Sequence, residues 1–488
     1  NVIVNTLKIQ SDGKILVGGN FTTYNSVSSV RIVRLNTNGT KDTSLNIGSG
    51  VNSTVNDIKI QSDGKILIGG NFTSYNSVSS IRLVRILSNG TRDTGFTLGT
   101  SFDETINIIE IQSDGKILIG GAFNKFNGIP QRGIVRLNTN GTYDYFSFEN
   151  GFNPTATIYS IKQLLDNTVL VGGSYSYYGG SNINYFTRLN SDGSLDTTLK
   201  TDSNFDNIVK SIIIQPDNKI LLSGDFSIYS GTTANRMIRL YQDGTIDSGF
   251  TVGNIFTNTI NVIRYQSDNK ILVGGNFTGT TYNYMAKINN DGSLDTNFIK
   301  GNGFNARVND IKIQSDGKIL VVGDFTTYSG ITQNRITRLN SDGTIDTSFN
   351  TSGSSFNSTA NTIFIDIDGK IIVSGNFTSY NGLPYYRIIK LNTDGTPDTE
   401  ITTINNPYSA ITYTVTSISN TSGRTGGYVS ADLNSKISEK GICYNTSINP
   451  TISDNKIICG NGIGYFSCDI SNLDRKSTRL NSSHGKLS

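Results

Sequence analysis

The sequence has no tryptophan, two methionines, three cysteines and one histidine among its 488 residues. It has no run of about 18 apolar residues, so we expect neither a transmembrane helix nor insertion into a membrane. Charged residues make up only 16 % of the chain and hydrophobic residues 35 %. The periodic segments are nevertheless too apolar, and the charge is too low, for a disordered chain.

The single histidine, His484, lies within residues 474–488, which resemble one reading frame of a common DNA-sequencing adapter. An ordinary basic tail is the alternative. We treat this segment as artefactual or disordered and leave it out of the fold. The rest of the chain has no histidine for general base catalysis or metal binding, so we expect no metal site and no cofactor.

The charges balance once this tail is set aside. It holds four of the 41 basic residues and one of the 38 acidic residues, which leaves 37 of each sign. A chain balanced in this way lacks the basic surface by which proteins bind nucleic acid or an anionic membrane. We therefore expect no nucleic-acid partner, and the composition predicts no oligomeric state.

The chain is rich in glycine, with 52 copies, and it contains a repeat that is clearest at residues 61–72, QSDGKILIGGNF. Eight copies follow one another at steps of 48 to 52 residues. A period of this length with several strands per unit is typical of a propeller or a solenoid. The residue after the turn aspartate marks the copies, at Gly13, Gly64, Gly115, Asn167, Asn218, Asn269, Gly317 and Gly369.

The copies with an Asp-Gly pair predict a hairpin, because this pair separates two apolar β-branched runs and glycine adopts positive φ at no steric cost. In the second strand, Ile66 and Ile68 point to one face and Leu67 to the other, so we expect both faces to be buried. Gly69 and Gly70 follow, where a side chain would obstruct a close backbone approach or a bulge.

A second hairpin completes each unit and places a basic residue eight positions before an aspartate. The two side chains then lie opposite each other on one face, so we predict a repeated cross-strand ion pair. The pairs are Arg34/Asp42, Arg85/Asp93, Arg136/Asp144, Arg188/Asp196, Arg239/Asp247, Lys287/Asp295, Arg338/Asp346 and Lys390/Asp398.

Two hairpins give four strands per period, the usual content of one propeller blade. Eight periods of about 51 residues therefore predict an all-β fold with an eight-bladed β-propeller over residues 1–400. An open β-solenoid is the alternative, although solenoid coils are usually shorter. The start at Asn1 leaves open whether a further strand or blade precedes it.

These motifs resemble the delta-60 β-propeller repeats of bacterial and viral proteins, typified by IQxDGKILVGGxF and RLNxDGxxDxxF. The resemblance covers about four-fifths of the chain. It implies a propeller and no established catalytic residues. The fourth unit departs most from the pattern, because QLLDNT at residues 163–168 replaces the common turn.

The period stops near Ile401, and short strand-like runs then predict a partial β-sandwich over residues 401–473. Residues 440–451 and 460–473 resemble the fibronectin type III-like modules of bacterial surface and phage proteins. Such modules reach about 100 residues, so we expect the last strands to be missing. Cys459 and Cys468 could form a disulfide, or they could be small buried side chains like Cys443.

Two kinds of site are conceivable in this sequence, a calcium loop and a pair of catalytic carboxylates. Residues 340–346 look like part of a calcium loop, but Arg338 and Phe349 stand where its terminal ligands are required, which favours a simple turn. Acids outside the repeat pattern could pair as in a glycosidase, although solvated loop carboxylates are the simpler interpretation. These acids are Asp103, Glu104, Glu149, Asp202 and Asp206.

Aromatic side chains recur three residues after the last aromatic of each strand copy, and they could either stack on sugars or pack between blades. They are Tyr24, Tyr75, Phe126, Tyr178, Tyr229, Tyr328 and Tyr380. Loops that differ between units, at residues 127–132, 178–185, 279–284 and 382–386, are better candidates for recognition. In them we predict ligand contacts at Tyr178, Tyr185, Tyr282, Tyr284, Tyr385, Tyr386 and Arg132.

Together these features predict a non-catalytic binding or structural module of a secreted, cell-surface or virion protein. It would present variable propeller loops to a glycan or a surface protein. The alternative is an extracellular enzyme that cleaves glycans with paired carboxylates on one propeller face. Two non-repeat carboxylates about 5–10 Å apart in one pocket would favour the enzyme.

Overall fold

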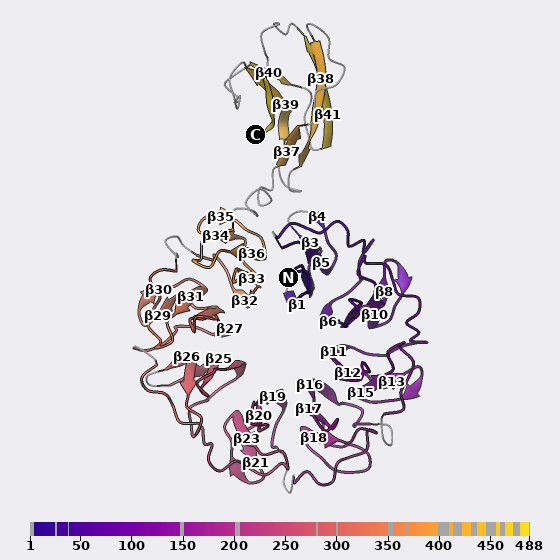
Figure 1. Cartoon of the computed structure of the whole chain (residues 1–488), viewed down its shortest axis with the longest axis vertical. Coiled ribbons are helices and arrows are strands. Elements are labelled where there is room, and N and C mark those ends of the chain that lie inside the picture. Colours follow the sequence, from indigo (N-terminus) through magenta and orange to yellow (C-terminus); the bar gives the residue numbers. More distant parts are fainter. Residues whose placement is uncertain are drawn as a thin grey trace. The chain divides into compact units, whose positions relative to one another are not determined.

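The computed structural model describes residues 4–24, 27–37, 39–146, 151–200, 205–279, 282–298, 301–349, 355–366 and 368–398, and six strands between residues 409 and 487. The chain divides into two compact units, Asn1–Tyr24 with Ser28–Glu400 and Asn25–Val27 with Ile401–Ser488. Every described element is a strand, and no helix able to cross a membrane is found among these residues. The first unit is an eight-bladed β-propeller, which confirms the predicted fold (Figure 1).

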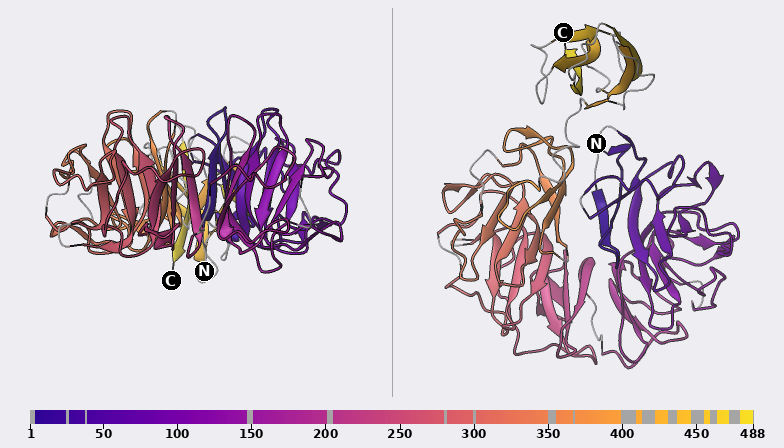
Figure 2. Two further views of the ribbon diagram at one scale, coloured as in Figure 1. Left: turned by 90° about the horizontal axis from the view of Figure 1, so that it is seen from below. Right: turned by 45° about the horizontal axis from the view of Figure 1, so that its top comes forward.

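Each blade is an antiparallel sheet of an innermost, a middle and a third strand, and the strands run from one face of the propeller to the other (Figure 2). The innermost strands surround the axis: β1 (Val4–Ile9), β6 (Val55–Ile60), β11 (Ile106–Ile111), β16 (Thr157–Gln163), β19 (Val209–Ile214), β24 (Ile260–Tyr265), β27 (Val308–Ile313) and β32 (Ala360–Ile365). The middle strands are β2 (Ile15–Gly19), β7 (Ile66–Gly70), β12 (Ile117–Gly121), β17 (Val169–Ser174), β20 (Ile220–Gly224), β25 (Ile271–Thr278), β28 (Ile319–Gly323) and β33 (Ile371–Gly375).

The third strands lie farther from the axis: β5 (Ile32–Leu35), β10 (Leu83–Ile86), β15 (Ile134–Leu137), β18 (Phe186–Leu189), β23 (Met237–Leu240), β26 (Asn283–Ile288), β31 (Ile336–Leu339) and β36 (Ile388–Leu391). Short hairpins join middle to third strands in six blades: β3 (Thr23–Tyr24) with β4 (Val27–Ser28), β8 (Ser74–Tyr75) with β9 (Val78–Ser79), β13 (Lys125–Phe126) with β14 (Ile129–Pro130), β21 (Ile228–Tyr229) with β22 (Thr232–Thr233), β29 (Thr327–Tyr328) with β30 (Ile331–Thr332) and β34 (Ser379–Tyr380) with β35 (Leu383–Pro384).

The prediction of four strands per blade is wrong. After β5 the chain adds a single bridge, between Leu35 and Lys41, and the other blades do the same. The side chain of Asp42 explains the difference, because its Oδ1 accepts hydrogen bonds from the backbone nitrogen and the hydroxyl of Ser44, at 2.9 and 2.6 Å. This local bonding competes with a longer ladder and turns the chain away from the blade.

The first hairpin of each unit forms as predicted. Gly64 has a φ of 79°, and all five residues of β7 are buried, so both faces of the middle strand are covered. A bulge in β6 lies opposite Gly69 and Gly70. A Cβ on Gly70 would lie 2.1 Å from the carbonyl oxygen of Thr54, and one on Gly69 would lie 2.9 Å from Ile106 of the next blade. Both glycines are therefore required by close packing.

The hydrophobic core lies between the blades. One cluster of buried side chains joins Leu16 and Ile32 of the first blade to Ile58 of the second. Another joins Ile372 of the eighth blade to Leu7 of the first, and so closes the ring. Because each cluster needs two neighbours, a blade on its own could not bury its apolar faces.

The predicted ion pair is confirmed in the six blades that carry arginine. The Nε of each arginine lies 2.5 to 2.8 Å from the Oδ2 of its aspartate. The two lysine blades differ, because the lysines exchange partners there. Lys270 contacts Asp295 at 2.7 Å and Lys287 contacts Asp268 at 3.3 Å. In the eighth blade Lys370 and Lys390 contact Asp398 and Asp366 in the same crossed way.

The same basic side chain also reaches into the next blade, which the sequence analysis did not foresee. Arg34 donates to the carbonyl oxygen of Ser88 at 2.5 Å, and Arg136 donates to that of Ser191 at 2.6 Å. Lys390 of the eighth blade donates to the carbonyl oxygen of Thr37 in the first. Each blade is thereby fastened to its neighbour by a charged hydrogen bond, and the last is fastened to the first.

The second unit contains two antiparallel sheets of three strands that face each other, as in a partial β-sandwich. The strands are β37 (Ser409–Thr412), β38 (Ser422–Ser430), β39 (Ile437–Asn445), β40 (Asn455–Ile458), β41 (Gly464–Ser471) and β42 (Arg479–Leu487). β42 lies in the segment interpreted as artefactual or disordered, and it pairs with the edge of β39. An open edge accepts any extended segment, since its hydrogen bonds come from the backbone. Cys459 lies outside the described residues.

We predict that replacing Arg239 by methionine destabilises the propeller strongly. Arg239 and Asp247 are each 2 % exposed, their side chains are 2.7 Å apart, and the guanidinium lies 4.5 Å from the centre of the Phe250 ring. Removing one partner of a buried pair costs about 3 kcal/mol or more. Chemical denaturation should show this loss for Arg239→Met and a smaller one for Arg239→Lys, because two blades use lysine here. Equal midpoints for Arg239→Met and the natural protein would contradict it.

The Asp247 carboxylate predicts a specific acid sensitivity. Burial alone would raise the pKa of Asp247, but hydrogen bonds from Lys219 and Arg239 outweigh it and lower the pKa from 3.8 to about 2. A lowered pKa stabilises the fold above pH 4, and this stabilisation of about 2 kcal/mol is lost as the pH falls to 2. The difference in unfolding free energy between the natural protein and Asp247→Asn should therefore shrink between pH 4 and pH 2. A constant difference would rule this out.

Candidate functional site

Two of the predicted ligand contacts are buried, which overturns their assignment to a binding surface. Tyr178 is 0 % exposed, its ring centre lies 4.6 Å from that of Phe152, and its hydroxyl donates to the carbonyl oxygen of Gly193 at 2.5 Å. Tyr385 is 2 % exposed within the core of the eighth blade. At the recurring aromatic position, stacking on sugars and packing between blades are both compatible with the sequence, and the structure shows packing. The same hydrogen bond is made by Tyr75, Tyr229, Tyr328 and Tyr380.

The other predicted contacts come from four different blades. Tyr185, Tyr282, Tyr284 and Arg132 are half-buried, and Tyr386 is 38 % exposed. Tyr185 and Tyr284 have φ values of 68° and 64°, and they stand where five other blades carry an arginine that also has positive φ. They thus occupy a repeated position at the start of the third strand, where each also packs against a hydrophobic cluster.

Two of the acids proposed as a catalytic pair, Asp103 and Asp206, belong to the repeat. Asp103 accepts hydrogen bonds from the backbone nitrogens of Asn124 and Lys125, both at 2.9 Å. Asp206 accepts the equivalent bonds in the fifth blade, as Asn52, Asn305 and Asn357 do in others. These carboxylates therefore hold a hairpin in place. Glu149 and Asp202 lie outside the described residues.

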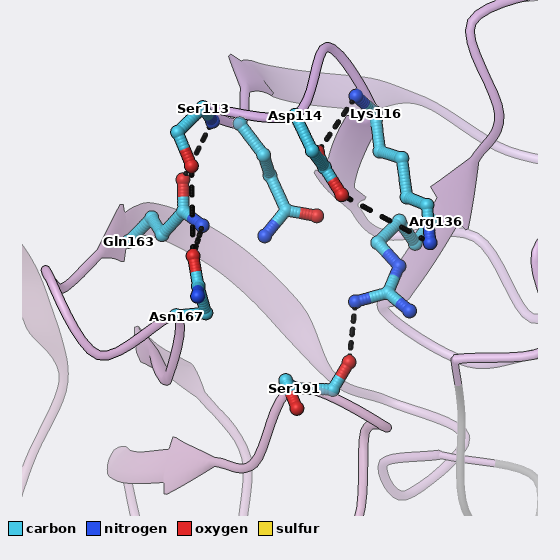
Figure 3. Close-up of a pocket in the computed structure, with 8 residues that line it drawn as sticks. Ser113, Asp114, Lys116, Arg136, Gln163, Asn167 and Ser191 are labelled. Carbon is cyan, nitrogen blue, oxygen red and sulfur yellow. Dashed lines mark hydrogen bonds and ion pairs between the residues drawn. The ribbon is translucent and has the colours of Figure 1, made fainter.

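The most distinctive polar site is a cleft of about 430 Å³ between the third and fourth blades (Figure 3). The third blade contributes the turn that follows β11 and one residue of β15. The fourth blade contributes the end of β16 and the turns that follow β16 and β18. The lining residues are Gln112, Ser113, Asp114, Lys116, Arg136, Gln163, Asn167 and Ser191.

Hydrogen bonds between the two blades set the shape of this cleft. The backbone nitrogen of Ser113 donates to Oε1 of Gln163 at 3.0 Å, and Nε2 of Gln163 donates to Oδ1 of Asn167 at 2.9 Å. Across the cleft, Arg136 donates to the carbonyl oxygen of Ser191 (Figure 3). The amides are thus held in one orientation before any ligand arrives, which lowers the entropy cost of binding.

The charges around the cleft compensate one another. Lys116 lies 3.1 Å from Asp144 and within 3.9 Å of Asp114, and Arg136 contacts Asp144 at 2.5 Å. Burial would raise the pKa of Asp144, but hydrogen bonds from Lys116 and Arg136 lower it, so the carboxylate stays ionised. Two cations and two anions leave a polar site without net charge, which suits a neutral ligand with hydroxyl groups.

An equivalent cleft lies between the seventh and eighth blades, and its lining differs from that of the cleft between the third and fourth blades. It is lined by the same residue types from its first blade, among them Gln314, Lys318 and Arg338. Its second blade, however, presents Ile365 and Gly369 where the fourth blade presents Gln163 and Asn167. The position of Asn167 also carries asparagine in the fifth and sixth units, whereas glutamine at the position of Gln163 is found in the fourth unit alone, so the pair of amides is specific to this unit.

Gln112 supplies a further unsatisfied group. It is 5 % exposed, and its Oε1 accepts no hydrogen bond from the described part of the chain. In the seventh blade the equivalent Gln314 accepts one from Arg338 at 3.4 Å. A buried acceptor without a partner costs about 1–3 kcal/mol. The unusual turn at residues 163–168 is visible in the sequence, but nothing in the sequence marks it as a site.

The repeat assigns the chain to a family. The family profile described as "Domain of unknown function (DUF5122) beta-propeller" matches residues 10–45, 61–96, 112–146, 165–199, 215–250, 266–298, 314–349 and 368–400. These eight matches cover more than half of the chain, so the protein belongs to the DUF5122 β-propeller family. No curated protein matches the sequence.

Solved structures show only a distant likeness. A protein of unknown function from Bacteroides caccae is 11 % identical, with a TM-score of 0.27 over 58 % of this chain and 92 % of that one. PorZ, a bacterial surface component of the type-IX secretion system of Porphyromonas gingivalis, is 10 % identical, with a TM-score of 0.40 over 99 % of this chain and 65 % of PorZ. A PL25 ulvan lyase is 10 % identical, with a TM-score of 0.29 over 87 % and 92 %. None of these supports a functional assignment.

The role of Tyr178 as scaffold can be tested directly. Tyr178→Phe removes the hydroxyl that donates to Gly193 but keeps the ring. We expect a loss of about 1–2 kcal/mol in unfolding free energy, because the buried carbonyl loses its donor. Denaturation of the variant beside Tyr386→Phe, at an exposed position, measures the difference. A destabilisation that is no larger at Tyr178 would contradict the assignment.

Proposed function

We propose that this propeller is a non-catalytic binding module of a secreted, cell-surface or virion protein, and that its ligand is a neutral glycan. The cleft between the third and fourth blades is the binding site. Its volume of about 430 Å³ falls in the range of small-molecule sites and suits one or two sugar rings. The β-sandwich that follows would act as a spacer.

One observation carries this proposal, namely the pair of amides that the fourth unit places in a cleft otherwise built from repeated residues. Gln163 and Asn167 each offer a donor and an acceptor, which is the complement that sugar hydroxyls require. Substitutions in a scaffold loop that create a preorganised polar lining are more readily explained by recognition than by packing. The compensated charges favour a neutral sugar over an acidic one.

A glycan-cleaving enzyme receives less support from the same residues. Asp103 and Asp206 each hold a hairpin of their own blade, and their carboxylates already accept two backbone hydrogen bonds. A general acid must carry a proton near neutral pH, whereas hydrogen bonds from Ser227 and Ile228 outweigh burial and lower the pKa of Asp206. Asp206 therefore lacks the raised pKa of a catalytic acid.

The test is a glycan array followed by calorimetry on the full chain. Neutral oligosaccharides should bind, and the substitution Asn167→Gly should weaken the best of them at least tenfold. Asn167 has a φ of 67°, which glycine adopts without strain, so the variant should fold. Asn218→Gly is the matched control, since Asn218 has a φ of 64° at the same turn position in the fifth blade.

Each outcome decides the proposal. Loss of binding in Asn167→Gly, with binding kept in Asn218→Gly, supports it. Equal affinities in both variants, or no binding of any neutral oligosaccharide, contradict it. New reducing ends in the bound glycan after incubation would instead support the enzyme.

A further inference from the structure

Eight residues occupy one equivalent position on the innermost strands, and together they form what we call the axial ring. Each is paired in register with a buried leucine or isoleucine of its middle strand, for example Lys8 with Leu16 and Lys312 with Leu320. All eight side chains are half-buried. The axial ring consists of Lys8, Lys59, Glu110, Lys162, Ile213, Arg264, Lys312 and Phe364.

These side chains face one another around the axis. Burial lowers the pKa of Lys8; the charges of Asp57 and Glu110 oppose this shift, and those of Lys59 and Lys162 add to it. Lys162 belongs to the fourth blade and Lys8 to the first, so their charges interact across the ring and not only along it. Burial likewise lowers the pKa of Lys312; the charge of Asp310 opposes this shift, and those of Arg264 and Lys8 add to it. The lysines of several blades therefore share one poorly solvated region.

Five of the eight residues are cations and only Glu110 is an anion. Glu110 forms ion pairs with two of them, Lys59 at 2.8 Å and Lys162 at 3.2 Å. Asp310 on β27 forms an ion pair with Arg264 at 2.6 Å. Asp310 and the equivalent Asp57 on β6 also accept hydrogen bonds from backbone nitrogens of the next blade. With these two aspartates counted, the axial region keeps a net charge of two positive.

Lys8 and Lys312 are the two lysines of the axial ring that make no direct ion pair in the described part of the chain, although the charges of Asp57 and Asp310 act on them. Neither lies within 4.0 Å of a carboxylate oxygen among the described residues, and the ammonium of Lys312 lies 4.8 Å from the centre of the Phe364 ring. Phe364 is on β32 of the eighth blade, and this blade lies between the blades that carry the two lysines. Poorly solvated ammonium groups without a counter-ion are costly, and a bound anion removes that cost.

We propose that the axial ring binds a doubly charged oxyanion, such as a sulfate or phosphate group, between Lys8 and Lys312. Its charge equals the excess of the axial region. The two ammonium groups supply up to six hydrogen-bond donors. This site is separate from the cleft of the fourth blade, so the two ligands bind independently.

The experiment titrates the full chain with sodium sulfate and with sodium phosphate at constant ionic strength and follows the midpoint of thermal unfolding and calorimetric heats. Saturable binding is expected in the natural protein. The double variant Lys8→Gln/Lys312→Gln should bind at least tenfold more weakly. Lys125→Gln, at an exposed lysine of β13, should bind as the natural protein does. The double variant should also fold without loss of midpoint in chloride, since it removes unpaired charges.

A second arm uses a sulfated oligosaccharide and its desulfated form, which distinguishes a free ion from a group carried on a larger molecule. Binding of either ligand that the double variant loses and Lys125→Gln keeps supports the site. No saturable binding of sulfate, phosphate or the sulfated sugar overturns it. Equal affinity in the natural protein and the double variant overturns it as well. Independent binding of a neutral glycan at the cleft leaves this result unaffected.

Discussion

The propeller depends on one repeated interaction, the buried basic side chain of the third strand. In each arginine blade the guanidinium neutralises an aspartate of its own blade. It also donates to the turn of the next blade and, in four blades, lies over a phenylalanine ring. A planar guanidinium can make these contacts at once because its donors point in several fixed directions. Burial of the charge is tolerated because both of its requirements, a counter-ion and hydrogen bonds, are met.

This interaction makes neighbouring blades interdependent. The hydrophobic clusters lie between blades, and the charged hydrogen bonds run in one direction around the ring. The eighth blade completes both networks, through Ile372 and through Lys390, which donates to Thr37 of the first blade. Closure of the ring is therefore built from the same contacts as every other interface.

The repeat made most of the fold predictable, because features shared by eight copies can be told apart from residues that vary between single copies. It correctly predicted the hairpin at Gly64, the burial of both faces of the strand that contains Ile66, and the pairing of Arg34 with Asp42. The predictions failed where a side chain makes hydrogen bonds with backbone groups outside its own strand. The pattern could not show that Asp42 would end the blade after three strands, or that Asp103 would bind a backbone turn. The predicted contacts at Tyr178 and Tyr385 failed for a related reason, since a variable loop can still bury its aromatic residues.

The candidate sites lie where the units have the same backbone structure but different side chains at equivalent positions. Gln163 and Asn167 replace Ile and Gly in a cleft that the seventh and eighth blades also form. A crystal structure of the chain with a neutral oligosaccharide tests this account most directly. We predict the sugar between the third and fourth blades, hydrogen-bonded to Gln163 and Asn167. Sugar bound equally in several clefts between blades, or on the exposed loop at Tyr386, would contradict it.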